Sequence, residues 1–166
     1  MAGVGTRERN HLGTLRNLTP AELQGRFPKL RPGTYTLVSK ATARYNCVAF
    51  ANDDDRHWWE PGLYGGQYYW PTGKARDTIE SWREIFEREG YEETHSRDIE
   101  PDYEKIAIYV SLEDFLPSHV AKSDGRRWKS KLGKGQDLEH ASLDLLEGDQ
   151  FDEYGVVEVV LRRAIK

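Results

Sequence analysis

The sequence predicts an α+β domain in which helices precede a mostly antiparallel sheet. Residues 78–89 carry apolar side chains at helical spacing, and Gly90 is a natural stop for that helix. Residues 104–111 alternate between two sets of side chains as a strand does, and residues 155–162 are rich in valine. Because the helical patterns come first and the strands gather in the second half, the pattern is not the βαβ alternation of parallel sheets.

Each helix has a recognisable start. Thr19 is a good N-cap, and Pro20 suits the first helical position. A second helix is expected over residues 46–52. For the helix over residues 78–89, Asp77 is the predicted cap, with a Glu three positions later completing a capping box.

A hairpin is expected in the second half of the chain. Residues 119–123 and 126–131 flank the dipeptide Asp124-Gly125, which favours a tight turn between two strands. Residues 137–147 then fit a helix with three leucines on its inner face.

Composition bounds what the protein does. The chain has 166 residues, 31% of them charged, and a mean hydropathy of -0.79, so we expect one soluble domain over residues 19–166. No apolar run approaches the ~20 residues of a membrane helix, and the start lacks the apolar segment of a secretory signal. With a single cysteine, these features favour the cytoplasm and argue against a disulfide framework.

Charge is unevenly distributed along the chain. Residues 1–44 contain eight Lys or Arg and only two Asp or Glu, whereas the whole chain has a net charge of -4. We expect residues 1–18 to form a basic, loosely ordered arm that contacts an acidic partner or the domain itself. The acidic remainder argues against a dedicated nucleic-acid-binding protein.

A thiol and an imidazole are the main candidates for chemistry. Cys47 stands at the start of the predicted second helix, where backbone amides favour a thiolate. His119 stands at the start of a predicted strand, where it could exchange a proton with that thiol. Asn46 is a candidate donor to a developing oxyanion. A lone buried cysteine or a lone histidine is otherwise an ordinary core residue.

A third polar group is needed to hold the imidazole ring. The return strand of the hairpin brings Ser130 beside the strand of His119, so Ser130 is the first choice. Asp137 and His140 are the alternatives.

These segments resemble the papain-like cysteine peptidases and amidases, especially the NlpC-type and CHAP-type hydrolases. The string from Tyr45 to Phe50 resembles their nucleophile motif, and residues 105–110 and 118–121 resemble the strand before the histidine and the histidine strand. The resemblance covers residues 44–133. The whole chain is also similar to an uncharacterised bacterial family of unknown function that shares the Tyr-Asn-Cys start, a Trp-rich stretch and a Ser-Lys-Leu-Gly segment.

The resemblance implies a papain-like α+β fold with helices packed on the sheet. It also implies hydrolysis or acyl transfer at an amide or ester bond of a small molecule or peptide, through a thioester on Cys47 with His119 as base. No cofactor is implied. The alternative is a non-catalytic module that holds a peptide or small ligand in the same aromatic cleft, because a likeness of fold alone does not establish an activity.

An aromatic stretch offers walls for such a cleft. Trp58, Trp59, Tyr69 and Trp70 lie in a long irregular segment, and Trp128 lies in the hairpin. These rings either stack on a ligand or cover the core beneath the loop, and large aromatic side chains can do both.

Two other signals remain open or weak. The basic cluster over residues 126–134 would bind an anion, or lower the pKa of a nearby thiol, or simply be a solvated strand face that guards against aggregation. We expect no metal site, because the Cys, His and Asp residues lack the spacing of zinc or calcium ligands.

Overall fold

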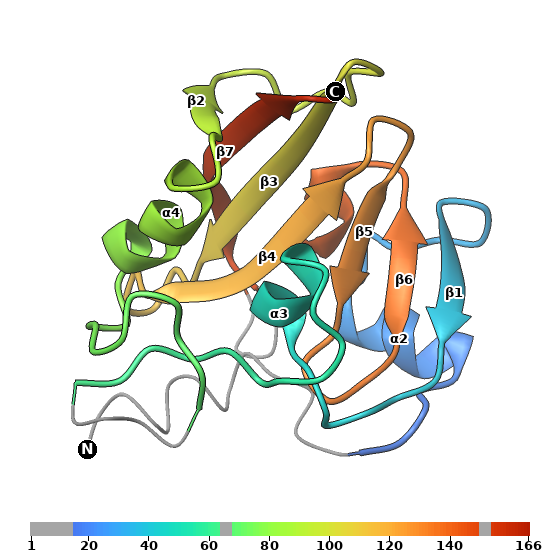
Figure 1. Cartoon of the computed structure of the whole chain (residues 1–166). Helices are drawn as coiled ribbons and strands as arrows, with labels where there is room; N and C mark the ends of the chain where they lie inside the picture. Colours follow the sequence, from blue (N-terminus) through green and yellow to red (C-terminus); the bar gives the residue numbers. More distant parts are fainter. Residues whose placement is uncertain (1–14, 64–67, 150–153) are drawn as a thin grey trace.

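The computed structural model describes residues 15–63, 68–149 and 154–166. Across these residues it is an α+β fold built on one antiparallel sheet of seven strands in the order β1-β6-β5-β4-β3-β7-β2 (Figure 1). The predicted α+β class with a mostly antiparallel sheet is confirmed. The elements are α2 (Pro20–Arg26), β1 (Tyr35–Ser39), α3 (Cys47–Ala51), α4 (Ile79–Glu87), β2 (Glu92–Thr94), β3 (Tyr103–Val110), β4 (Pro117–Ser123), β5 (Trp128–Lys131), β6 (Asp137–His140), the 3₁₀ helix η1 (Leu143–Leu146) and β7 (Val156–Ala164).

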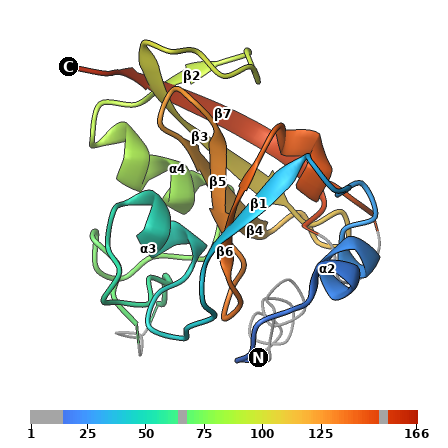
Figure 2. The same cartoon turned by 90° about the vertical axis from the view of Figure 1, so that its right-hand side faces the viewer.

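The sheet separates two apolar clusters. Because side chains alternate along a strand, β3 sends Ala107 and Tyr109 into one cluster and Ile106 and Ile108 into the other. The cluster of Tyr109 also contains Leu23 of α2, whereas the other cluster contains apolar residues of α3 and α4. Figure 2 shows the same division, with α3 and α4 on one side of the sheet and α2 on the other.

Local signals fix the helix starts. Thr19 and Glu22 form a full capping box at α2, with Pro20 in the first turn, as predicted. The predicted cap of α4 is wrong by one residue, because Thr78 accepts the hydrogen bond from the backbone of Ser81. Asp77 instead accepts a hydrogen bond from Trp82 Nε1 at 2.8 Å.

The helix predicted over residues 137–147 is wrong. Asp137–His140 forms strand β6, hydrogen-bonded between β1 and β5, and only Leu143–Leu146 turns as a short 3₁₀ helix. The leucine spacing fitted a helix, but pairing with strands on both sides outweighs that local preference. The order of elements also differs from the prediction, since β1 precedes α3.

The end of the predicted basic arm is attached to the domain. Residues 1–14 lie outside the described residues. At Leu18, the backbone N–H donates to Gln136 Oε1 at 3.0 Å, and the carbonyl accepts from Gln136 Nε2 at 2.9 Å. Asn17 Oδ1 also accepts from the backbone N–H of Ala41 at 2.7 Å. Within the described ranges, no helix has both the length and the apolar character to cross a membrane.

Candidate active site

Cys47 is the first residue of α3 and is buried, with 2% of its surface exposed. The helix begins there because Asn46 is extended and its side-chain oxygen accepts a hydrogen bond from the backbone of Ala49 at 3.2 Å. Figure 1 shows α3 against the sheet between β4 and β5. These two strands carry the predicted partners of Cys47.

Asn46 also fastens the aromatic segment to the start of α3. Its Nδ2 donates to the carbonyl of Trp59 at 2.7 Å, and its Oδ1 accepts from the Trp59 backbone N–H at 3.2 Å. The side-chain amide of Asn46 therefore caps α3 and also holds the backbone of Trp59 in place. Its predicted role at an oxyanion stays a prediction.

The predicted imidazole lies in a buried chain of hydrogen bonds. His119 Nε2 lies 2.9 Å from Ser130 Oγ, and the same oxygen lies 2.8 Å from His140 Nε2. His140 Nδ1 in turn lies 2.9 Å from the carbonyl oxygen of Ser142. All three side chains are at most 2% exposed. The structure thus brings together His119, Ser130 and His140 from three adjacent strands.

The hydrogen bonds that link His119, Ser130 and His140 run across the sheet from β4 to β6. β4 and β5 pair through Lys122↔Lys129 and Ser123↔Trp128. The bond between His119 and Ser130 joins the two strands beyond this ladder, on the side of the sheet that holds Tyr109. Asp137, the other predicted orienting residue, is the cross-strand neighbour of Lys131 on β6 and takes no part in these hydrogen bonds.

Aromatic rings hold the face of His119. The ring of Tyr154 lies parallel to it, with 4.1 Å between centroids and 4° between planes, and Tyr109 meets it edge-on at 5.2 Å. The backbone carbonyl of Tyr154 accepts a hydrogen bond from Ser118 at 2.5 Å, which fixes it to the strand of His119. Tyr154 was not predicted, because nothing local in the sequence signals a ring stack across 35 residues.

Lys131 is a buried cation near the thiol. Its side chain is completely buried, and its Nζ donates to the carbonyl oxygens of Thr42, at 2.9 Å, and Gly133. The same Nζ lies 5.0 Å from the ring centre of Tyr45, two residues before Cys47. Burial lowers the pKa of Lys131 to about 8, and the charges that Cys47 and Asp137 carry when ionised offset part of this shift.

The predicted aromatic wall divides into two groups. Trp58 and Trp59 are half-buried and face Tyr68 and Tyr69, which are 42% and 50% exposed. The other predicted members, Trp70 and Trp128, are buried in the two apolar clusters. Only the first group offers rings to a ligand in this arrangement.

The basic cluster is not one open basic surface. Arg127 forms an ion pair with Glu139, Lys129 forms one with Asp124 at 2.9 Å, and Lys131 is buried. Across the described part of the chain, no three His, Cys, Asp or Glu side chains gather where they could hold a metal ion.

Comparison with known proteins adds a family. A family model described as "Domain of unknown function (DUF7689)" matches residues 36–162, which include every residue of the site. The chain belongs to this family. No curated protein and no solved structure matches it.

Proposed function

We propose that the protein is a thiol-dependent hydrolase or acyltransferase that acts on an amide or ester bond. Cys47 is the nucleophile, His119 is the base, and Ser130 orients the ring of His119. The observation that carries this proposal is the buried bond from His119 Nε2 to Ser130 Oγ, because it joins β4 and β5, the two strands against which α3 packs with Cys47 as its first residue. A nucleophile, a base and a group that holds the base are the parts of covalent acyl transfer.

The charges near Cys47 support the thiolate form. The raising effect of Cys47 on the pKa of Lys131 is larger than that of Asp137, the cross-strand neighbour of Lys131. The sulfur and Lys131 Nζ are therefore close enough for their charges to interact. A nearby cation favours a thiolate over a thiol.

The reaction follows from these roles. The thiolate attacks the carbonyl carbon, and the π electrons of the carbonyl move onto its oxygen. The electron pair on the oxygen then re-forms the carbonyl as the C–N or C–O bond breaks, the imidazolium of His119 gives its proton to the leaving amine or alkoxide, and a thioester remains on Cys47. Because Nε2 is bonded to Ser130, this proton leaves from Nδ1. Water then loses a proton to His119 and attacks the thioester, which releases the acid and restores the thiolate. An amine or alcohol in place of water gives acyl transfer.

The aromatic segment supports a substrate with an apolar or aromatic group beside the reactive bond. Asn46 ties the backbone of Trp59 to the start of α3, so the segment that carries Trp59 and Tyr69 is attached at the residue before the nucleophile. Exposed tyrosines bind apolar groups at little entropic cost.

Labelling of the thiol tests the proposal. At pH 6 an ordinary thiol is almost wholly protonated, so a thiolate at Cys47 should react with iodoacetamide at least about tenfold faster than free cysteine. His119→Ala should remove this excess, whereas the exposed control His95→Ala should keep it. A wild-type rate no higher than that of free cysteine would refute the enzyme.

The second candidate is a binding module that uses the aromatic segment without catalysis. It is favoured by the exposure of Tyr68 and Tyr69 together with the burial of Cys47, since a cysteine among apolar side chains is also an ordinary core residue. Slow labelling combined with ligand-dependent tryptophan fluorescence would select this module.

A further inference from the structure

The backbone carbonyl of Ser142 sets the positions of the protons in the buried chain. A carbonyl oxygen only accepts hydrogen bonds, so His140 Nδ1, 2.9 Å away, carries a hydrogen. Burial lowers the pKa of His140 to about 4, and the hydrogen bond to Ser142 offsets this only in part. The ring is therefore neutral near pH 7, and its Nε2 has a lone pair.

The hydroxyl of Ser130 must then point one way. Its single hydrogen goes to His140 Nε2, 2.8 Å away, which can only accept. The oxygen of Ser130 is left to accept from His119 Nε2, 2.9 Å away. His119 therefore carries its hydrogen on Nε2, and Nδ1 is the nitrogen that takes up and releases a proton.

We propose that His140 is a positioning residue that acts through Ser130 to hold His119 in the tautomer protonated on Nε2. The catalytic consequence rests on the proposed function, because only this tautomer leaves Nδ1 unprotonated and able to take the proton of Cys47. A serine alone is a poor guide for an imidazole, since its hydroxyl can turn and donate to Nε2. If the Ser130 hydroxyl rotated in this way, His119 would carry its hydrogen on Nδ1, and Nδ1 could no longer act as the base. His140 prevents this rotation because its Nε2 accepts the hydrogen of the Ser130 hydroxyl.

Nuclear magnetic resonance tests the tautomer without any measurement of activity. In the full-length Cys47→Ala protein at pH 8, no thiolate competes for the proton of His119, and long-range ¹H–¹⁵N spectra report which ring nitrogens carry hydrogen. We expect hydrogen on Nε2 of His119 and on Nδ1 of His140. Hydrogen on Nδ1 of His119, or an even mixture, would overturn the proposal even if Cys47 proved highly reactive.

Variants test the consequence. His140→Leu lets the Ser130 hydroxyl turn towards His119, so iodoacetamide labelling of Cys47 at pH 6 should slow about tenfold, the value of one buried hydrogen bond. Ser130→Ala should cost about as much, and the double variant no more than either single change, because the two residues act as one unit. His140→Gln, whose Oε1 can accept from Ser130, should restore most of the rate.

His95→Leu is the matched control, because His95 is exposed. Additive losses in the double variant, or a wild-type rate for a folded His140→Leu protein, would contradict the proposal. If His140→Leu does not fold, the spectra of Cys47→Ala and the rate of His140→Gln still decide. If wild-type Cys47 labels no faster than free cysteine, the proposed function fails while the tautomer remains measurable.

Discussion

Two buried lysines, Lys105 and Lys131, have the same charge but different polar surroundings. Both side chains are completely buried. Lys105 lies on β3 under the segment between β2 and β3, and Lys131 lies at the end of β5 next to the loop that leads to Cys47. Taking an ammonium ion out of water is costly in both places.

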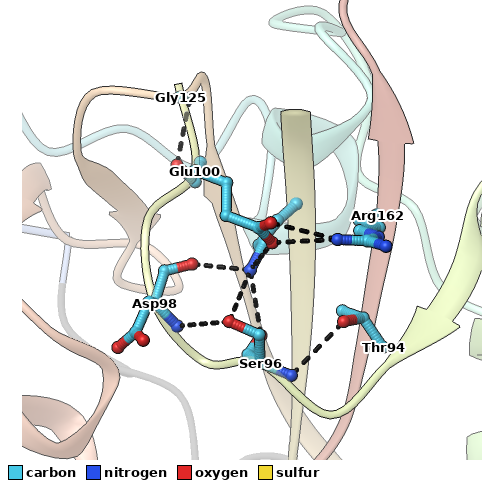
Figure 3. A network of polar contacts seen from close by, with 8 residues as sticks. Thr94, Ser96, Asp98, Glu100, Gly125 and Arg162 are labelled. Atoms are coloured by element: carbon cyan, nitrogen blue, oxygen red, sulfur yellow. Dashed lines mark hydrogen bonds and ion pairs between the residues drawn. The ribbon is translucent and has the colours of Figure 1, made fainter. Parts of the chain in front are cut away.

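The ammonium group of Lys105 has both hydrogen-bond acceptors and a carboxylate around it. Its Nζ contacts the carbonyls of Ser96 and Asp98, at 3.0 and 2.6 Å, the hydroxyl of Ser96 at 3.2 Å and the carboxylate of Glu100 at 2.5 Å. Figure 3 shows Ser96, Asp98 and Glu100 gathered in one polar network, with Arg162 hydrogen-bonded to the Glu100 carboxylate. The hydrogen bond from Lys105 lowers the pKa of Glu100. This charge is neutralised, and it fastens residues 94–100 to the sheet.

Lys131 has hydrogen bonds but no close carboxylate. Its Nζ is bonded to the carbonyls of Thr42 and Gly133, and among the described residues no carboxylate oxygen lies within ion-pair distance. Two neutral carbonyl acceptors take two of the three hydrogens of the ammonium group without cancelling its charge. The charge is therefore available to stabilise a thiolate at Cys47, as the proposed function requires.

The largest effect should separate the two lysines by stability. Lys105→Met leaves two buried carbonyls without their donor and leaves Glu100 with Arg162 as its remaining partner, so we expect the free energy of unfolding to fall by about 3 kcal/mol. Lys131→Met also removes hydrogen bonds, but it relieves the burial of a charge with no close counter-ion, so its loss should be about 1 kcal/mol or less. Urea unfolding at pH 7 measures both. Equal losses would mean that the two surroundings are energetically alike.

Acid should act on the candidate active site before it acts on the Lys105 network. The pKa of His140 is about 4 in the fold against 6.5 for an ordinary histidine, so the unfolded chain binds more protons between these values. Stability should thus fall as the pH drops from 6.5 towards 4, by about 3 kcal/mol in total. Glu100 has a lowered pKa, so the stability that it contributes is lost only below its ordinary value of 4.5.

Urea unfolding at pH 7, 5.5 and 4.5 measures this difference. His140→Gln should flatten the decrease above pH 4.5, and Lys105→Met should leave its slope unchanged. The exposed control His95→Gln should also keep the wild-type slope. If wild type and His140→Gln lose stability in parallel, the buried neutral histidine is not the cause.

The helices and most strands could be predicted because their signals are local. A capping residue lies within three positions of the amide that it caps, as Thr19 and Asn46 do, and strand alternation is complete within residues 104–111. Residues 137–147 defeated the same reasoning, because leucines at positions 138, 143 and 146 suit a helix as well as a strand followed by a turn. Pairing with β1, about a hundred residues earlier, decided the outcome.

The candidate site was predictable only in part, for the same reason. Ser130 was inferred as the partner of His119 because a hairpin turn places the two strands side by side. The bond from Lys131 to Thr42 spans 89 residues, and the stack of Tyr154 on His119 spans 35, so no local pattern carries either contact. What the sequence left open is the environment of the thiol, which tertiary contacts supply.

The smallest predicted effect concerns the interaction between Lys131 and the Cys47 thiol. If the charge of Lys131 supports the thiolate, Lys131→Met should raise the pKa of Cys47 by about one unit, and iodoacetamide labelling at pH 6 should slow about tenfold. Lys129→Met is the matched control, because Lys129 lies on the same strand and is paired with Asp124.

The reverse measurement needs no substitution. Alkylation of Cys47 with iodoacetamide makes the sulfur neutral, so by linkage the pKa of Lys131 should fall further below 8, as ¹³C spectra of its ε-carbon would report. An unchanged pKa of Lys131 after alkylation would mean that the two groups do not interact, and Lys131 would then be a fastener of the Thr42 loop, as Lys105 is of residues 94–100.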